Sequence, residues 1–355
     1  MPSSPAYAFL SPLDANTAAN DRRFATLDEV VATNVVERSQ TDRARTLLVV
    51  DAACDLPAAW LREHGVCVLP IHVHVDGCTL IDSRDEETAV EFFASDHAGH
   101  DVAASTQPMT PADTCTFLLS HLTSEIDFAL QISIASSRSR IYLNSLAAMQ
   151  ALTTPHNRAR RELGRRDPLR SWVIDSGTGF TGQGVLVTEA VRLLDAGMPT
   201  PAVAARIREL APQVHTLVVP KDLFCLYNRA RDKGDRSLSW LGYNVAQRLD
   251  IKPVIHANAG DTRPLFKVRG HAEAIERTLE LCTKHVQQGL AVPTICVSYA
   301  GPIDVIEAWP GFADLRAACE WRGVELLCST MSLTGGVSVG SEAFSVAFAT
   351  KRPVL

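Results

Sequence analysis

The chain has 355 residues, of which 46% are hydrophobic and 21% are charged, and its formal net charge is -6. This length accommodates two domains, since a domain usually runs to about 100 to 200 residues. The negative charge argues against a nucleic acid as the main partner. The nine cysteines are odd in number and form no Cys-x-x-Cys pair, which favours reduced thiols over a zinc cluster or a disulfide framework.

Residues 1–45 are polar and are expected to form an N-terminal extension, with one weakly helical patch at 27–36. The chain does not start with basic residues followed by an apolar stretch, and no apolar run approaches the roughly 20 residues of a membrane span. A cytoplasmic location without stable membrane insertion is therefore expected.

Residues 46–211 are predicted to form a first α/β domain. Short apolar strands alternate there with amphipathic helices, which is typical of a mostly parallel sheet covered by helices on both faces. The strands are expected at 47–51, 66–75, 128–135 and 172–175, and the helices near 57–64, 86–94, 111–122, 140–152 and 184–194.

Residues 156–170 carry six arginines and interrupt this pattern. They are expected to be a solvated insertion, either an exposed loop or a short helix. The alternative is a surface that docks onto an acidic partner or an anionic membrane.

Residues 212–355 are predicted to form a second α/β domain. Strands outnumber crossover helices in this region, so a mixed sheet flanked by helices is expected. The strands are expected near 215–219, 253–257, 265–268, 294–299, 324–328 and 343–349, and the longer helices at 272–288 and 303–321.

Three connections in the first domain are rich in hydroxyl side chains. They read Ala-Ser-Thr-Gln-Pro at 104–108, Ala-Ser-Ser-Arg-Ser at 135–139 and Asp-Ser-Gly-Thr-Gly-Phe-Thr-Gly at 175–182, and each precedes a predicted helix. In a parallel sheet such turns gather at the carboxyl edge of the strands, where ligands bind. Helix N-termini and hydroxyls both donate hydrogen bonds, so three turns together suit one carboxylate or phosphate. Taken singly, each turn is explained by helix capping.

The third connection also places Gly177, Gly179 and Gly182 in the spacing of the dinucleotide fingerprint, between a strand and a helix. That fingerprint requires an acidic residue about 20 positions further on, at the end of the next strand. The nearest candidate, Asp195, ends a predicted helix instead. A nucleotide-dependent enzyme that uses the turn from Gly177 to Gly182 is therefore the alternative hypothesis.

Other catalytic templates are absent from the sequence, which contains no Gly-x-Ser-x-Gly elbow, no Walker-type phosphate loop and no His-Glu-x-x-His. His72 and His74 alternate along one predicted strand. Without a third ligand nearby in sequence, they are expected to be half-buried strand histidines rather than a metal site. We expect no catalytic residue, no metal and no cofactor.

Over residues 46 to about 350 the chain resembles the DegV family. Six motifs of that family occur in order: Val-Asp-Ala-Ala-Cys-Asp-Leu-Pro at 50–57; Pro70, Gly77 and Asp82; Ser-Thr-Gln-Pro at 105–108; Ala-Ser-Ser-Arg-Ser-Arg-Ile-Tyr at 135–142; Asp-Ser at 175–176; and Ile-Lys-Pro at 251–253 followed by Val-Arg at 268–269.

The resemblance implies a two-domain α/β protein that buries a long-chain fatty acid in a cleft between its domains. By the family's motifs, Ser105 and Ser136 would hold the carboxylate, with Thr106, Ser137 and Ser139 as supporting candidates. A lipid-sensing regulator is an alternative that shares these binding residues.

The resemblance also implies a separate ATP-dependent fatty acid kinase as a partner that phosphorylates the bound lipid. Arg231, Arg236, Arg269 and Ser338 are then the candidate contacts for a phosphate or for that partner. Ser338 stands where the family has a histidine, so the titratable group associated with the phosphorylation step is missing. Arg138 and Arg140 stand where the family has Leu and Gly, and solvent is the expected environment of both.

Overall fold

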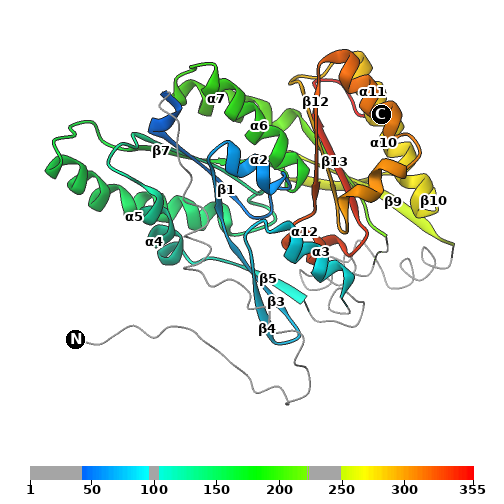
Figure 1. Ribbon diagram of the computed structural model, residues 1–355, viewed down its shortest axis with the longest axis horizontal. Helices are drawn as coiled ribbons and strands as arrows, with labels where there is room; N and C mark the ends of the chain where they lie inside the picture. The colour runs from blue at the N-terminus through cyan, green and yellow to red at the C-terminus, as the bar shows by residue number, and fades with distance from the viewer. Residues whose placement is uncertain (1–41, 96–103, 222, 224–248) are drawn as a thin grey trace.

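The computed structural model describes residues 42–95, 104–221, 223 and 249–355 (Figure 1). Within this part of the chain the strands form three sheets. We refer to residues 42–213 as the N-terminal half and to residues from 214 onward as the C-terminal half, because the strands up to β7 pair with one another and β8 begins a new sheet at Val214. A short 3-10 helix, η1 (Asp42–Arg45), leads into the first strand.

The first sheet is parallel, with strand order β2-β1-β6-β7. Its strands are β1 (Thr46–Asp51), β2 (Val66–Leu69), β6 (Phe128–Ser133) and β7 (Arg170–Asp175). Its helices are α2 (Ala58–Glu63), α4 (Pro111–His121), α5 (Ile141–Glu162), α6 (Thr181–Asp195) and α7 (Thr200–Leu210). Every residue of β1 is buried, as a central strand covered on both faces must be. The predicted parallel sheet is confirmed.

A small antiparallel sheet with order β4-β3-β5 was not predicted. It comprises β3 (Ile71–Val75), β4 (Cys78–Asp82) and β5 (Ala104–Pro108), and helix α3 (Glu86–Ala94) follows β4. The single strand predicted at 66–75 is therefore wrong: Pro70 lies between β2 and β3, which belong to different sheets. The first hydroxyl-rich connection is also a strand rather than a turn, because it pairs with β3.

The arginine-rich segment is only partly the solvated insertion that was predicted. Helix α5 continues through Pro155 to Glu162, and the side chain of Arg160 is only 1% exposed. Arg160 donates to the carboxylate of Asp127 at 2.5 Å and to the carbonyls of Ser124 and Ile126. The prediction failed for this residue because these partners lie more than 30 positions earlier in the chain.

The C-terminal half contains a mixed sheet with strand order β10-β9-β8-β13-β11-β12, as predicted. β11 and β12 are parallel, and the other neighbours are antiparallel. The strands are β8 (Val214–Val219), β9 (Ile251–Asn258), β10 (Asp261–Arg269), β11 (Thr294–Tyr299), β12 (Glu325–Thr330) and β13 (Phe344–Ala349).

Helices α10 (His271–Gln288), α11 (Phe312–Arg322) and α12 (Leu333–Val339) accompany this sheet, together with the 3-10 helices η3 (Ala211–Gln213) and η4 (Ile303–Ala308). The helix predicted at 303–321 is thus split into η4 and α11. No helix in the described ranges is long and apolar enough to cross a membrane.

The two halves share one helix and one apolar layer. Helix α6 contacts β6 of the parallel sheet and also β8, β11 and β13 of the mixed sheet, so it lies between the two sheets (Figure 1). Helix α12 lies beside α3 and contacts β3 and β5. The buried side chains between these elements form a layer that we call the apolar seam, comprising Val73, Val75, Leu80, Ala89, Phe92, Leu333 and Val337.

Candidate functional site

The second and third hydroxyl-rich connections meet at the hairpin between β9 and β10. The Ser137 hydroxyl donates to the Gly260 carbonyl at 2.8 Å, and the Gly260 N–H donates to the Gly177 carbonyl at 2.7 Å. Within the N-terminal half, the Ala135 N–H donates to the Thr178 carbonyl at 2.7 Å. Two turns at the carboxyl edge of the parallel sheet therefore form one surface with a hairpin of the C-terminal half.

The three glycines of the dinucleotide fingerprint are explained by close packing. A Cβ on Gly177, whose φ is +62°, would lie 3.0 Å from the Ala259 Cα, and a Cβ on Gly182 would lie 2.1 Å from the Thr216 Oγ1. A Cβ on Gly179 would lie 3.1 Å from a side-chain carbon of Ile134. At Gly177 and Gly182 the C-terminal half thus fills space beside this turn that a pyrophosphate would need.

The N-terminus of α6 is also covered. Thr181 and Gly182 are buried, and the Thr181 hydroxyl lies 2.8 Å from the Ser345 hydroxyl of β13. Thr178 is joined to Thr216 of β8 in the same way at 2.7 Å. The helix end that would receive a phosphate in a dinucleotide-binding protein is used here to join the two halves.

A buried carboxylate orders the second connection. Asp51, at the end of β1, accepts hydrogen bonds from the Ile134 N–H at 2.8 Å, from the Gln183 side chain at 3.0 Å and from the Ala53 N–H at 3.3 Å. Burial raises the pKa of Asp51 to about 6, and these donors oppose the shift. The Asp51 carboxylate therefore fixes the start of the loop that carries Ser136.

The first motif lies on strand β5, where its two hydroxyls point to opposite faces. Thr106 lies opposite Val73, which is fully buried in the apolar seam. Ser105 lies opposite His74 and is exposed. Directly opposed residues of an antiparallel pair share a face, so the half-buried Thr106 side chain lies on the face of the seam and Ser105 lies on the other.

Strand β5 is tied to the second connection through α5. The Asn144 side chain, one turn into that helix, donates to the carbonyl of Met109 at 2.7 Å, just beyond the end of β5. The first and second motifs are therefore neighbours in space.

The five predicted carboxylate contacts divide into two groups. The hydroxyl of Ser137 is bonded to Gly260, and that of Ser139 accepts from the Ile141 N–H at 3.3 Å. The hydroxyls of Ser105, Thr106 and Ser136 form no hydrogen bond within the described part of the chain. These three are available to a ligand.

The predicted contacts for a phosphate or partner are scattered. Arg231 and Arg236 lie outside the described residues. Arg269 is exposed on β10. Ser338 is half-buried in α12, and its hydroxyl donates to the Thr334 carbonyl at 2.6 Å.

The other positions singled out in the sequence have ordinary surroundings. Arg138 and Arg140 are exposed, as expected. His74 bonds to Thr79 and to Gln107, both at 2.9 Å, and His72 is half-buried. Among the described residues, no group of three or more His, Cys, Asp or Glu side chains could hold a metal ion.

Sequence reasoning missed a buried charge cluster that joins the halves. The Asp55 carboxylate accepts from the Ser298 hydroxyl at 2.6 Å and from the Ser332 N–H at 2.9 Å. The buried Arg84 guanidinium lies 3.5 Å from Asp55 and donates to the Thr330 carbonyl at 2.9 Å. Burial raises the pKa of Asp55, and Arg84 opposes that shift. Only the acidic motif residue was visible in the sequence, because Ser298 and Ser332 lie more than 240 positions later.

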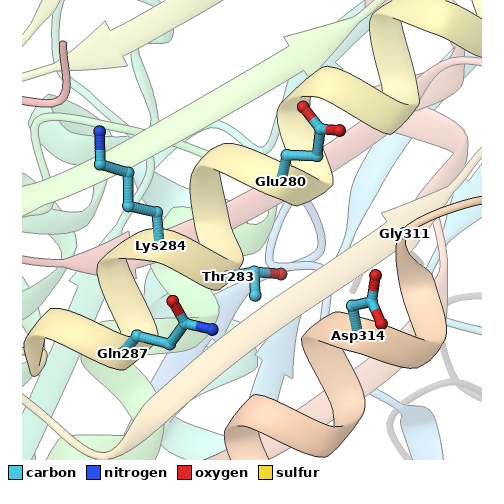
Figure 2. A pocket seen from close by; sticks show the side chains of 6 residues that line it. All are labelled: Glu280, Thr283, Lys284, Gln287, Gly311 and Asp314. Atoms are coloured by element: carbon cyan, nitrogen blue, oxygen red, sulfur yellow. The ribbon is translucent and has the colours of Figure 1, made fainter.

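Two small cavities lie in the C-terminal half, away from the hydroxyl-rich connections. One, of about 200 Å³, is an open groove whose lining side chains come from α10 and the start of α11 (Figure 2). Its lining includes the charged side chains of Glu280, Lys284 and Asp314, which do not suit an alkyl chain. The other, of about 190 Å³, lies beside the Lys221–Glu342 ion pair, whose N···O distance is 2.8 Å.

The parallel sheet, the mixed sheet, the small antiparallel sheet and the two hydroxyl-rich turns that meet the C-terminal half define an α/β protein of the DegV type. The chain belongs to the DegV family: the family model described as "Uncharacterised protein, DegV family" matches residues 45–351.

Relatives in this family support the same fold. A DegV domain-containing protein of Xanthomonas axonopodis pv. citri is 37% identical over 304 residues, which cover 86% of this chain and 97% of that protein. The crystal structure of DegV from Bacillus subtilis, described as a fatty acid binding protein, is 19% identical with a TM-score of 0.66, covering 86% of this chain and 99% of that one. A stearic acid-binding protein from Eubacterium ventriosum is 18% identical with a TM-score of 0.65, covering 86% and 98%.

Proposed function

We propose that this protein binds a long-chain fatty acid between its two halves and acts as a carrier or presenter of that lipid. The observation that carries the proposal is the pair of free hydroxyls of Thr106, on the face of the apolar seam, and of Ser136, in the neighbouring second connection. Family relatives described as binding fatty acids, including stearic acid, support the choice of ligand.

Thr106 takes the role first expected of Ser105 in this proposal. A ligand with a polar head and an apolar tail must place both groups on one side of β5, and only Thr106 shares the face of Val73 and the seam. Ser136 supplies the second hydroxyl, and its own N–H is held by the Asp175 carboxylate at 3.2 Å. Ser137 and Ser139 shape the loop, because their hydroxyls are already bonded.

Such a site suits a fatty acid whose alkyl tail supplies most of the binding free energy. Each buried methylene contributes about 0.8 kcal/mol, so a long alkyl chain supplies most of the binding free energy. The hydroxyls contribute less affinity, and their role is to prevent the carboxylate from being buried without hydrogen-bond donors. Neutral donors also cost less to desolvate than lysine or arginine, so the site need not contain a cation.

The resemblance implies a handover of the lipid to a separate ATP-dependent fatty acid kinase, and the residues of this chain at that step depart from the family's. In this chain the hydroxyl of Ser338, in place of the family's histidine, is occupied by the Thr334 carbonyl. The nearby Glu342 is exposed and paired with Lys221. Neither arrangement offers an extra cation to a phosphate, which favours carriage or sensing of the lipid over its phosphorylation.

The nucleotide-dependent alternative loses its main support, since the glycine turn from Gly177 to Gly182 is packed against the C-terminal half. Thermal shift on delipidated protein separates the two functions. Oleate at 100 times its dissociation constant is expected to stabilise the fold by about 2.7 kcal/mol, whereas NAD, NADP and ATP are expected to leave the melting temperature unchanged. A shift with a nucleotide and none with oleate would overturn the proposal.

Head-group variants sharpen this test. Thr106→Val together with Ser136→Ala removes both free hydroxyls, and the loss of each partner is expected to cost about 1 to 3 kcal/mol of binding free energy. Thr116→Val together with Ser120→Ala is the matched control, because both hydroxyls lie on α4 and donate to carbonyls of that helix. Equal oleate affinity in the two double variants would place the carboxylate elsewhere.

A further inference from the structure

The side chain of Phe93 lies where two apolar layers meet. It is half-buried near the end of α3 and packs against the apolar seam. It also packs against a second buried cluster in the C-terminal half, formed by Val218, Ala300, Met331, Val339 and Ala343. Among the described residues it is the one side chain that packs against both layers.

The Phe93 ring rests directly on the backbone of α12. A Cβ on Gly336 would lie 2.0 Å from the Phe93 Cε1 and 2.6 Å from its Cζ. Glycine is unfavourable inside a helix, and at this position any larger residue would displace the ring. Gly336 therefore forms a seat for Phe93, and α12 supplies Leu333 and Val337 to the seam on either side of it.

The proposed function fixes where an acyl chain would start. A chain with its carboxylate at Thr106 would enter the seam beside Val73, and α12 packs against the same seam. The second cluster adjoins the seam at Phe93, whose side chain packs against both. A longer chain reaches the second cluster only if the ring is displaced.

We infer that Phe93, seated on Gly336, is the residue that sets the length of acyl chain this protein accepts. This inference rests on the proposed fatty-acid function and adds the specificity determinant to it. The ring limits the depth of the site for long saturated chains, and a smaller apolar side chain at this position extends the site into the second cluster.

A competition experiment tests the inference. Delipidated protein is incubated with an equimolar mixture of laurate, palmitate, stearate and arachidate, and the bound acids are quantified by mass spectrometry. In Phe93→Leu, which keeps an apolar side chain in the core, the ratio of arachidate to palmitate is expected to rise by at least roughly fourfold, the gain from one additional buried methylene. Phe117→Leu is the control, because Phe117 is buried in the separate core around α4.

Gly336→Ala tests the seat itself. The new Cβ displaces the ring, so the distribution of bound acids changes when Phe93 is present and changes much less in the Phe93→Leu background. Gly184→Ala is the matched control, because Gly184 also lies inside a helix, α6, and its Cβ would meet Cys296 and Leu56 of a separate core.

The outcomes separate this inference from the function beneath it. If wild type, Phe93→Leu and Phe117→Leu bind the same distribution of acids, the role of Phe93 is wrong while fatty-acid binding stands. If the wild type binds none of the four acids, the proposed function fails and the inference fails with it.

Discussion

The Ser137 hydroxyl of the β6–α5 loop donates to the Gly260 carbonyl of the β9–β10 hairpin at 2.8 Å. Its neighbour Ser136 is exposed and has a hydroxyl with no partner among the described residues. Adjacent serines of one motif therefore have different roles, since Ser137 joins the two halves and Ser136 remains available to the ligand.

Substitution of the two serines should separate these roles. Ser137→Ala is expected to lower the free energy of unfolding by about 0.5 to 1.5 kcal/mol, because a hydrogen bond between the halves is lost. Ser136→Ala is expected to leave stability unchanged and to weaken oleate binding. Urea denaturation and oleate titration of both variants measure this. Equal stability of the two variants would show that the Ser137 contact contributes nothing.

Gly182→Ala is expected to destabilise the protein by about 1 to 3 kcal/mol, the usual range for overpacking. The new Cβ would lie 2.1 Å from the Thr216 Oγ1 and 2.6 Å from the Thr178 Oγ1, which are themselves 2.7 Å apart. Combining it with Thr216→Ala should cost less than the sum of the two single substitutions, since the clash is relieved. Additive losses in chemical denaturation would mean that the glycine is not required by this contact.

Two arginines of α5 should differ sharply in their effect on stability. Arg160→Met removes one of the two arginine partners of the buried Asp127 carboxylate, the other being Arg45, and leaves the Ile126 carbonyl without this donor; the expected cost is about 1 to 3 kcal/mol. Arg158→Met removes an exposed pair with Glu162 and is expected to cost at most about 0.5 kcal/mol. Thermal denaturation of the two variants is the measurement. A small loss for Arg160→Met would contradict the structural role of this residue.

Acid should destabilise the protein in part through His215. Its ring donates from Nε2 to the Thr350 carbonyl, and its Nδ1 lies 2.9 Å from the Nε2 of His256. Burial together with His256 and His285 lowers the pKa of His215 to about 4. In the unfolded chain the His215 ring is therefore protonated near pH 6.5, whereas in the folded protein it stays neutral until the pH falls to about 4. This contribution to stability is complete above about pH 6.5 and is lost as the pH falls toward 4.

His215→Phe is expected to flatten that loss, because the titrating ring is replaced by an apolar ring that can keep the tilted contact with Phe348. The comparison is made as the difference in unfolding free energy between variant and wild type. Taking this difference cancels the contribution of Asp51, which has the opposite sign. The raised pKa of Asp51 stabilises the fold at low pH, and this stabilisation is lost as the pH rises through about 6. The same slope in both proteins between about pH 4 and 7 would assign the titration to another group.

The sequence predicted the elements whose signals are local and missed those that depend on distant partners. The alternation of apolar strands and amphipathic helices was sufficient for the parallel sheet and the mixed sheet. The sequence predicts a turn where β5 forms, because Ser and Pro are typical of turns and the partner strand β3 lies about 30 positions earlier. The sequence also predicts too short a helix at α5, because Pro155 and the charged residues after it are typical of a helix end.

The candidate site was predicted by motif and refined by geometry. The hydroxyls of Thr106 and Ser136 were both among the predicted contacts, but only the pairing of β5 with β3 shows that Thr106, rather than Ser105, shares a face with the apolar seam. The glycine spacing from Gly177 to Gly182 had two interpretations in sequence. The contacts of these glycines with Ala259 and Thr216 decide between them, because such contacts depend on the packing of the two halves.

The central claim is that a long-chain fatty acid occupies this protein. The most direct measurement is denaturing mass spectrometry of the protein purified gently from cells, with the lipid extracted and quantified against the polypeptide. We expect close to one long-chain fatty acid per chain in the wild type and a large loss in the variant that combines Thr106→Val with Ser136→Ala. Folded wild-type protein that carries no fatty acid and takes none up from solution would contradict the account.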